Sequence, residues 1–272
     1  MGTGGGNGRR QSDGSRRHAD FYPDFIDGLC ADTGRCECEE REEGEGVIKA
    51  ICFDLFFTLI IPSYEKENNE YDILGLSAEE WERYAENASL YRERALGYVK
   101  SEREIIEKIT ASMPCEISDE QKQSLLKARE NRMKNALQNV PDEITGAIKV
   151  LKAKGKQIGL ISNADRIDCK YWEKSKLFPF FDDAVFSCEA GLLKPDRRIY
   201  ELAMRRLGVR PGECVFVGDG GSDELRGAKE AGMKTVFTEA LEAKSDKSRK
   251  HILQYSDYHI RNFAELAVWI GL

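Results

Sequence analysis

The sequence has no hydrophobic run near the roughly 18 residues that a membrane-spanning helix requires, and its N-terminus lacks the hydrophobic segment of a secretory signal. It also lacks an excess of positive charge, since 41 Lys and Arg residues are outnumbered by 48 Asp and Glu residues, for a net charge of -7. An acidic surface repels phosphate backbones and anionic lipids. We therefore expect a cytoplasmic protein with neither nucleic acid nor membrane as a partner.

The cysteines show no spacing typical of a disulfide framework. Five of the eight are scattered through the chain, so reduced thiols are expected: Cys52, Cys115, Cys169, Cys188 and Cys214. The other three and one nearby histidine form no paired CxxC pattern, which disfavours a zinc site: Cys30, Cys36, Cys38 and His18.

Residues 1–46 contain ten glycines, scattered charge and few aliphatic side chains. Such a segment cannot bury enough apolar surface to offset the entropy lost on ordering, so it is predicted to be a disordered leader. The whole chain of 272 residues is 41% hydrophobic and 33% charged, which is typical of a soluble globular protein. Its length allows one large domain or a core with an insertion.

From residue 47 onward, short apolar runs alternate with helical patterns. Nearly continuous apolar runs indicate strands that are buried on both faces, as in a parallel sheet. The alternation predicts an α/β fold with a doubly wound, Rossmann-like sheet. The expected strands lie at 47–53, 158–161, 184–187, 214–217 and 235–237, and the expected core spans 47–61 and 141–272.

About a hundred residues separate the first two expected strands, far more than one crossover helix requires. Helix-start signals inside this stretch predict an inserted, all-helical cap domain over residues 62–140. The signals pair a serine with a Glu or Gln three positions later: Ser77 with Glu80, Ser101 with Glu104, and Ser118 with Gln121. Three aromatic residues at helical spacing, Trp81, Tyr84 and Tyr91, are expected to pack between helices rather than face a ligand.

Polar residues follow four of the buried segments, where a doubly wound sheet binds its ligands. Asp54 ends the first strand in Phe-Asp-Leu-Phe-Phe-Thr-Leu, and Ser162 ends the second in Leu-Ile-Ser-Asn. Lys194 stands in Gly-Leu-Leu-Lys-Pro, and Asp219 and Asp223 stand in Val-Gly-Asp-Gly-Gly-Ser-Asp. Each motif is weak alone, but four strand ends that agree predict one shared site.

The order, spacing and strand context of these motifs resemble the haloacid dehalogenase superfamily of hydrolases, including a helical cap inserted after the first motif. The resemblance covers roughly residues 47–240. It implies that Asp54 is a nucleophile that forms a covalent aspartyl intermediate. It further implies that Ser162 binds the transferring group, that Thr58 holds the nucleophile, and that Asn163 adds a donor.

A phosphate ester and a carboxylate are both anions, so cations must neutralise such a site. Lys194 supplies one positive charge. Clustered acids next to Asp54 are unfavourable unless a divalent cation lies among them, and oxygen ligands favour Mg²⁺. The expected metal ligands are Asp54, the backbone carbonyl of Phe56, Asp219 and Asp223, with Glu224 as the alternative second acid.

The sequence departs from the resemblance at one turn. Phosphatases of the superfamily usually carry a second aspartate, the general acid and base, where this chain has Phe56, and commonly a glycine where it has Phe57. A bulky residue there resembles the 2-haloacid dehalogenases, whose leaving halide needs no proton.

We expect a Mg²⁺-dependent phosphatase of a small phosphate ester. The alternatives are dehalogenation by Asp54 at carbon, and a catalytically weak binding protein. Substrate identity and oligomeric state are not indicated by the sequence.

Overall fold

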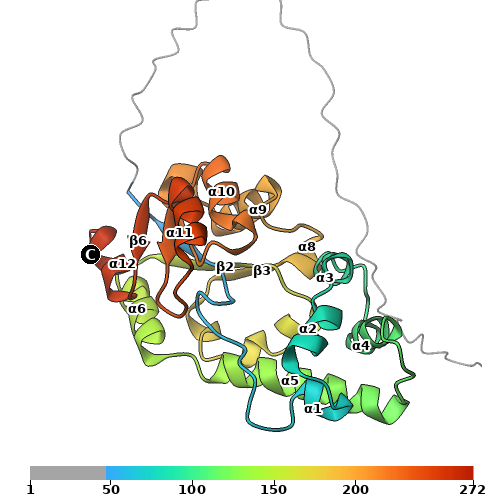
Figure 1. Cartoon of the computed structure of the whole chain (residues 1–272). Helices are drawn as coiled ribbons and strands as arrows, with labels where there is room; N and C mark the ends of the chain where they lie inside the picture. The colour runs from blue at the N-terminus through green and yellow to red at the C-terminus, as the bar shows by residue number, and fades with distance from the viewer. Residues whose placement is uncertain (1–46, 272) are drawn as a thin grey trace, which may run out of the picture. The chain divides into compact units, whose positions relative to one another are not determined.

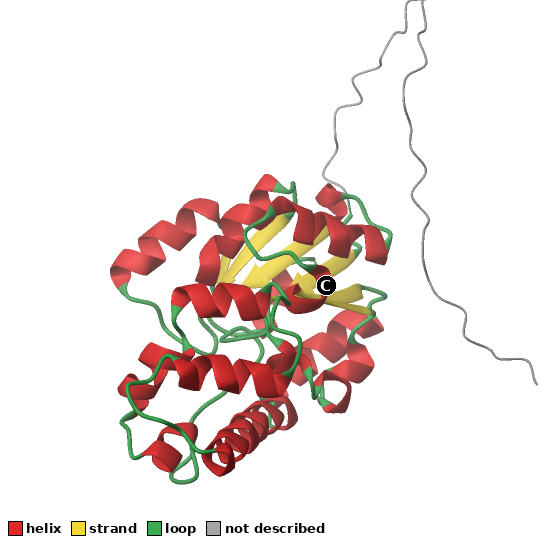
Figure 2. Ribbon diagram, turned by 90° about the vertical axis from the view of Figure 1, so that its right-hand side faces the viewer, coloured by secondary structure: helices red, strands yellow, loops and turns green. Residues whose placement is uncertain are grey.

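A six-stranded parallel sheet forms the centre of the protein in a computed structural model that describes residues 47–271 (Figure 2). The strand order is β3-β2-β1-β4-β5-β6, which confirms the doubly wound α/β fold. The predicted leader at 1–46, with its cysteines and His18, lies outside the described residues. The strands are β1 (Ala50–Phe53), β2 (Gln157–Ser162), β3 (Asp183–Phe186), β4 (Cys214–Gly218), β5 (Lys234–Thr238) and β6 (Tyr258–Ile260).

The four residues of β1 are completely buried and alternate between two hydrophobic clusters. Ile51 and Phe53 belong to one cluster, and Ala50 and Cys52 belong to the other. Successive side chains of a strand point to opposite faces of the sheet, so a strand covered by helices on both faces must be apolar throughout. This explains the continuous apolar run in the sequence.

Helices cover both faces of the sheet (Figure 1). Helices α6 and α12 contribute to the cluster of Ile51, whereas α9, α10 and α11 contribute to the cluster of Ala50. The core helices are α6 (Asp142–Ala153), α7 (Arg166–Cys169), α8 (Ser187–Ala190), α9 (Arg197–Leu207), α10 (Glu224–Glu230), α11 (Asp246–Ile252) and α12 (Ala264–Trp269).

Helix α6 is flanked by residues typical of helix ends. Pro141 precedes its first turn, and Gly155 follows Lys154 with a φ of 76°, a left-handed conformation that glycine adopts without strain. The apolar residues spaced along one face of this helix, Ile144, Ile148 and Leu151, are all buried in the cluster of Ile51.

The segment 62–140 contains five helices and no strand in the structure. They are α1 (Glu70–Leu74), α2 (Ala78–Ala85), α3 (Ala88–Ala95), α4 (Glu102–Ala111) and α5 (Asp119–Gln138), and Figure 1 shows them gathered on one side of the core. Trp81 and Tyr84 pack in a third hydrophobic cluster, as expected for helix packing.

The predicted helix starts are present. Ser77 and Ser118 each accept a hydrogen bond from the backbone N–H three residues later, and Glu80 and Gln121 return one. Ser101 accepts from the backbone N–H of Glu104 at 3.1 Å. The carboxylate of Glu104 instead accepts from the backbone N–H of Lys100. Only one of the two hydrogen bonds of a capping box is therefore present at this third helix start.

Helix α5 connects the inserted helices to the core. Leu125 is buried in the third cluster, whereas Met133 and Leu137, further along the same helix, are buried in the cluster of Ile51. The described residues lie within one compact unit, so the division into cap and core domains at 62–140 stays a prediction. Within 47–271, no helix combines the length and apolar character needed to cross a membrane.

Candidate active site

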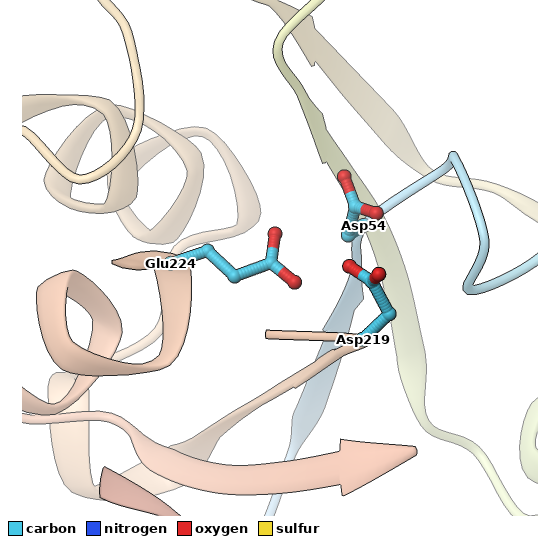
Figure 3. A group of neighbouring side chains, drawn as sticks. All are labelled: Asp54, Asp219 and Glu224. Carbon is cyan, nitrogen blue, oxygen red and sulfur yellow. The ribbon is translucent and has the colours of Figure 1, made fainter. Parts of the chain in front are cut away.

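Three buried carboxylates meet at the carboxyl ends of the central strands. Asp54 follows β1 and Asp219 follows β4, the two strands paired at the middle of the sheet, and Glu224 begins α10. One oxygen from each lies within 4.8 Å of the others, and Figure 3 shows the three side chains pointing toward one another. Their exposed fractions are 4%, 5% and 1%, so water screens this charge weakly.

Lys194 provides the positive charge among these carboxylates. Its Nζ donates to Asp54 Oδ1 and, at 2.5 Å, to Glu224 Oε2. Burial lowers the pKa of Lys194, but the two carboxylates outweigh it and raise that pKa above its usual value. Lys194 is therefore a fixed cation, as predicted, and it faces the predicted nucleophile.

The carboxylates remain incompletely compensated. Burial raises the pKa of Asp54, and Asp219 adds to this effect, while Lys194 opposes it. Burial and then Asp54 raise the pKa of Glu224 well above its usual value. Three acids are paired with only two lysines, Lys194 and Lys244, so a buried negative charge remains and the arrangement favours a further cation.

Asp54 is held in place from two sides. Its backbone N–H donates to the carbonyl of Val217 on β4 at 2.9 Å. The hydroxyl of Thr58, which is completely buried, donates to Asp54 Oδ2 at 3.1 Å. Thr58 therefore orients the carboxylate, which agrees with the role that the resemblance implied.

Asp219 is oriented by a residue that the sequence reasoning missed. Its Oδ1 accepts from the backbone N–H of Gly221 at 3.1 Å, and its Oδ2 accepts from Nζ of Lys244 at 2.6 Å. The Nζ of Lys244 also lies 5.6 Å from the centre of the Phe57 ring. Lys244 follows β5 in a segment without a recognisable motif, so only the fold could reveal it.

Asn163 makes contacts that the resemblance did not imply, whereas the role of Ser162 stays a prediction. Asn163 accepts from the backbone N–H of Lys194 at 2.8 Å and donates to its carbonyl at 3.2 Å, so its amide positions Lys194. The hydroxyl of Ser162 is completely buried and has no hydrogen-bond partner among the described residues. Ser162 is not among the residues that line the cavity beside Asp54, so its contact with the transferring group stays a prediction.

The structure does not bring Asp223 into the carboxylate group. Ser222 and Asp223 both have a φ of 52°, and this left-handed backbone turns the Asp223 carboxylate toward Arg226 and His251, each 3.3 Å away. The side chain of Asp223 is 48% exposed. Glu224, the alternative acid, occupies the site instead, and its Oε1 accepts from the backbone N–H of Gly220 at 3.0 Å.

The turn after Asp54 contains two phenylalanines, Phe56 and Phe57. Phe57 has a φ of 57°, a conformation that favours glycine, and its N–H donates to the carbonyl of Ile60 at 2.7 Å. Phe56 and Phe57 both line the cavity next to Asp54. The position usually held by the second aspartate therefore presents an aromatic ring.

The sequence model of the haloacid dehalogenase-like hydrolases matches residues 48–232, which hold all four motifs. The chain belongs to this family. The resemblance drawn from the motifs is thereby confirmed.

Relatives within the haloacid dehalogenase-like hydrolases include a phosphatase. Over 112 residues the chain is 39% identical to a glyceraldehyde 3-phosphate phosphatase of Methanothermobacter thermautotrophicus. The match covers 39% of this chain and 49% of the relative, so the chain spans about half the length of the curated relative.

Solved structures of family members share the fold. A family enzyme from Bacteroides thetaiotaomicron, in complex with magnesium and inorganic phosphate, is 20% identical with a TM-score of 0.57, covering 73% of this chain and 98% of that one. A 2-haloacid dehalogenase from Pseudomonas syringae pv. Tomato is 24% identical with a TM-score of 0.56, covering 82% and 99%. Fold similarity alone does not separate a phosphatase from a dehalogenase.

In the present chain, a cavity of about 480 Å³ lies next to the three carboxylates. Its floor includes Asp54, Lys194, Asp219 and Glu224 at the strand ends. Its roof comes largely from the inserted helices and the loop before them: Tyr64, Glu82, Glu86, Tyr91, Arg129 and Arg132. A larger cavity of about 650 Å³ is lined by none of the three carboxylates.

Tyr91 departs from the expected helix packing. It lines the cavity instead of lying within the cluster of Trp81. Burial raises the pKa of its hydroxyl above the usual value, and Asp168 adds to this effect. The inserted helices therefore supply an aromatic wall to the site, which helical spacing could not distinguish from a packing stripe.

Proposed function

We propose that this chain is a Mg²⁺-dependent phosphatase that transfers the phosphoryl group of a small phosphate ester to Asp54 and then to water. The observation that carries the proposal is the convergence of three buried carboxylates, two of which, Asp54 and Glu224, are paired with the ammonium of Lys194. The glyceraldehyde 3-phosphate phosphatase among the relatives supports a small phosphorylated substrate.

In the first step, a carboxylate oxygen of Asp54 attacks phosphorus, the bond from phosphorus to the ester oxygen breaks, and the ester oxygen takes a proton from water and leaves as an alcohol. The Thr58 hydroxyl keeps the carboxylate oriented, and the Lys194 ammonium offsets its charge, so the approach of a second anion is less unfavourable. In the second step, water attacks the aspartyl phosphate and inorganic phosphate leaves. Asp54 is regenerated.

The residues present fit Mg²⁺. The donors are carboxylate oxygens, the type that hard divalent cations prefer, and one oxygen from each of the three residues lies within 4.8 Å of the others. Asp54, Asp219 and Glu224 would hold the ion, with the Phe56 carbonyl as a further ligand. When bound, Mg²⁺ would offset the surplus negative charge and polarise the phosphoryl oxygens.

Dehalogenation at carbon is less well supported by the same geometry. A haloacid is an anion that would enter a site with three carboxylates and two lysines, both of which are already ion-paired. No described arginine other than Arg129 and Arg132 lines the cavity, and both are ion-paired with carboxylates. An anionic carbon substrate would therefore meet little free positive charge.

A metal-dependence assay tests the proposal. Phosphate release from 4-nitrophenyl phosphate and acetyl phosphate should require Mg²⁺, stop in EDTA and return when Mg²⁺ is restored. Asp54→Asn serves as the blank. Halide release from 2-chloropropionate in EDTA would overturn the phosphatase in favour of the dehalogenase, and no turnover of any ester would overturn both the metal and the reaction proposed here.

We also propose that the enzyme acts in the cytoplasm. The five cysteines at described positions are all unpaired by disulfides, which is typical of a reducing compartment. Fluorescence imaging of the full chain with a C-terminal tag tests this, and a compartment other than the cytoplasm would overturn it.

A further inference from the structure

The roof of the cavity contains an arginine with a free hydrogen-bond donor. Arg129 lies on α5 and lines the same cavity as Asp54. Its side chain is 5% exposed. Its Nη2 donates to Asp165 Oδ2 at 2.8 Å and to Asp168 Oδ1 at 3.1 Å, whereas its Nη1 has no partner among the described residues.

These two hydrogen bonds hold the guanidinium rigidly. Asp165 and Asp168 are themselves fixed, because each accepts from the backbone at the start of α7. A buried polar nitrogen without an acceptor is unfavourable, and proteins usually satisfy such groups. The free Nη1 is therefore a preorganised donor that a ligand oxygen in the cavity would satisfy.

The neighbouring arginine of α5 has no such free donor. Nε and Nη2 of Arg132 donate to Glu70 Oε1 at 3.0 and 2.8 Å, and its Nη1 donates to the carbonyl of Pro62 at 3.2 Å. Arg132 therefore ties α5 to the first residue of α1 and to Pro62 in the segment before it. It serves as a matched control because it lines the same cavity from the same helix.

The charge around Arg129 indicates the kind of oxygen that it would bind. Arg94, also buried, approaches Asp165 at 3.3 Å, so two arginines face the two aspartates Asp165 and Asp168. This cluster carries no surplus positive charge. The carboxylates of Glu82 and Glu86 also line the cavity and disfavour a second anion. An uncharged oxygen fits this roof better than a carboxylate or a second phosphate.

We propose that Arg129 is a specificity-determining residue that donates through Nη1 to a hydroxyl or carbonyl oxygen on the organic part of the substrate. The substrate class is then small phosphate esters whose carbon skeleton bears an uncharged oxygen away from the phosphate. This inference rests on the proposed phosphatase function. It assigns the phosphate to the floor of the cavity and the polar carbon skeleton to the roof.

The test uses pairs of esters matched in size and leaving-group acidity. The pairs are 4-ethylphenyl and 4-(hydroxymethyl)phenyl phosphate, their 3-substituted isomers, and butyl and 3-hydroxypropyl phosphate. The wild type should prefer the hydroxyl-bearing member of at least one pair by about tenfold or more in kcat/KM, the range expected for a hydrogen bond to a charged donor. Arg129→Lys should reduce that preference toward one, and Arg132→Lys should retain it.

Each other outcome overturns the inference. An equal loss of both members of a pair in Arg129→Lys would show that Arg129 only supports the fold. If the wild type hydrolyses all the esters without preference, the role of Arg129 is overturned and the proposed phosphatase function stands. If it hydrolyses none of the esters, both proposals are overturned. If circular dichroism shows that Arg129→Lys does not fold, Arg129→Gln replaces it, and the absence of a wild-type preference overturns the inference without any variant.

Discussion

The floor and the roof of the cavity differ in their balance of charge. On the floor, Asp54, Asp219 and Glu224 are paired with only two lysines, Lys194 and Lys244, and the excess negative charge is buried. In the roof, Arg94 and Arg129 are balanced by Asp165 and Asp168, and one guanidinium nitrogen is left without a partner. An unbalanced floor suits metal-assisted chemistry, whereas a balanced roof suits recognition of a neutral group. Variants in each region should therefore fail in different ways.

The largest expected effect comes from removing the nucleophile on the floor. Asp54→Asn should lower kcat by roughly 10³-fold or more, because an amide does not displace an alcohol from phosphorus. The substitution also removes one buried like charge while Lys194 keeps Glu224 as a partner. The melting temperature should therefore not fall. Steady-state kinetics and calorimetry measure the two effects, and substantial turnover by the variant would sink the assignment of Asp54.

The next largest effect concerns the leaving group. Because Phe56 holds the position of the usual general acid, alcohols that leave easily should be released much faster than poor ones, by roughly 10² to 10⁴ between aryl and alkyl phosphates. A series of esters with Mg²⁺ present measures the slope of rate against leaving-group acidity. Equal rates would mean that another carboxylate, such as Glu82 or Glu86 of the roof, donates the proton.

The neighbouring acids Asp223 and Glu224 test which residue binds the metal on the floor of the cavity. Glu224→Gln should weaken Mg²⁺ binding at least about tenfold, while Asp223→Asn should change it less than about twofold, because only Glu224 joins Asp54 and Asp219. Titration calorimetry with Mg²⁺ and no substrate measures both. The reverse order of effects would restore Asp223 as the second acid.

The smallest expected effect is a pH dependence of stability in the roof. Burial and then Asp165 raise the pKa of Asp168 from 3.8 to about 6, against the opposing effect of Arg129. The native state thus keeps a proton that the unfolded state releases between about pH 4 and pH 6, so stability from this group is present at low pH and is lost as pH rises through 6.

Asp168→Asn removes this titration. Between pH 4 and pH 7 the unfolding free energy of the variant, relative to that of the wild type, should rise by about 2–3 kcal/mol. Urea unfolding at the two pH values measures it. A difference that does not change with pH would show that Asp168 is ionised in the native state across the whole range.

Floor and roof also differ in how far the sequence predicts them. Asp54, Lys194 and Asp219 follow or lie near buried strands, and the parallel sheet brings such positions to one edge, so their convergence was foreseeable. The choice between Asp223 and Glu224 could not be predicted. It depends on a left-handed backbone conformation at Ser222 and Asp223 that the sequence does not indicate. The sixth strand, β6, was missed because its three residues are too few to form a pattern.

The roof was beyond sequence reasoning for a different reason. Helical spacing places residues on a face of a helix but does not say what that face meets, so Tyr91 was expected to pack like Trp81. Arg129 resembles any charged residue of an amphipathic helix until its partners are known. Its ion partners, Asp165 and Asp168, lie more than thirty positions further along the chain, at separations of 36 and 39.

The two hydrogen bonds between Asn163 and the backbone of Lys194 carry a practical consequence for protein engineering. They join positions separated by 31 residues, and they set where the ammonium can reach. A graft of the Lys194 loop into a related scaffold should therefore bring the asparagine with it. Without that amide, the transplanted lysine would keep its charge, but its ammonium would no longer be held in the same position.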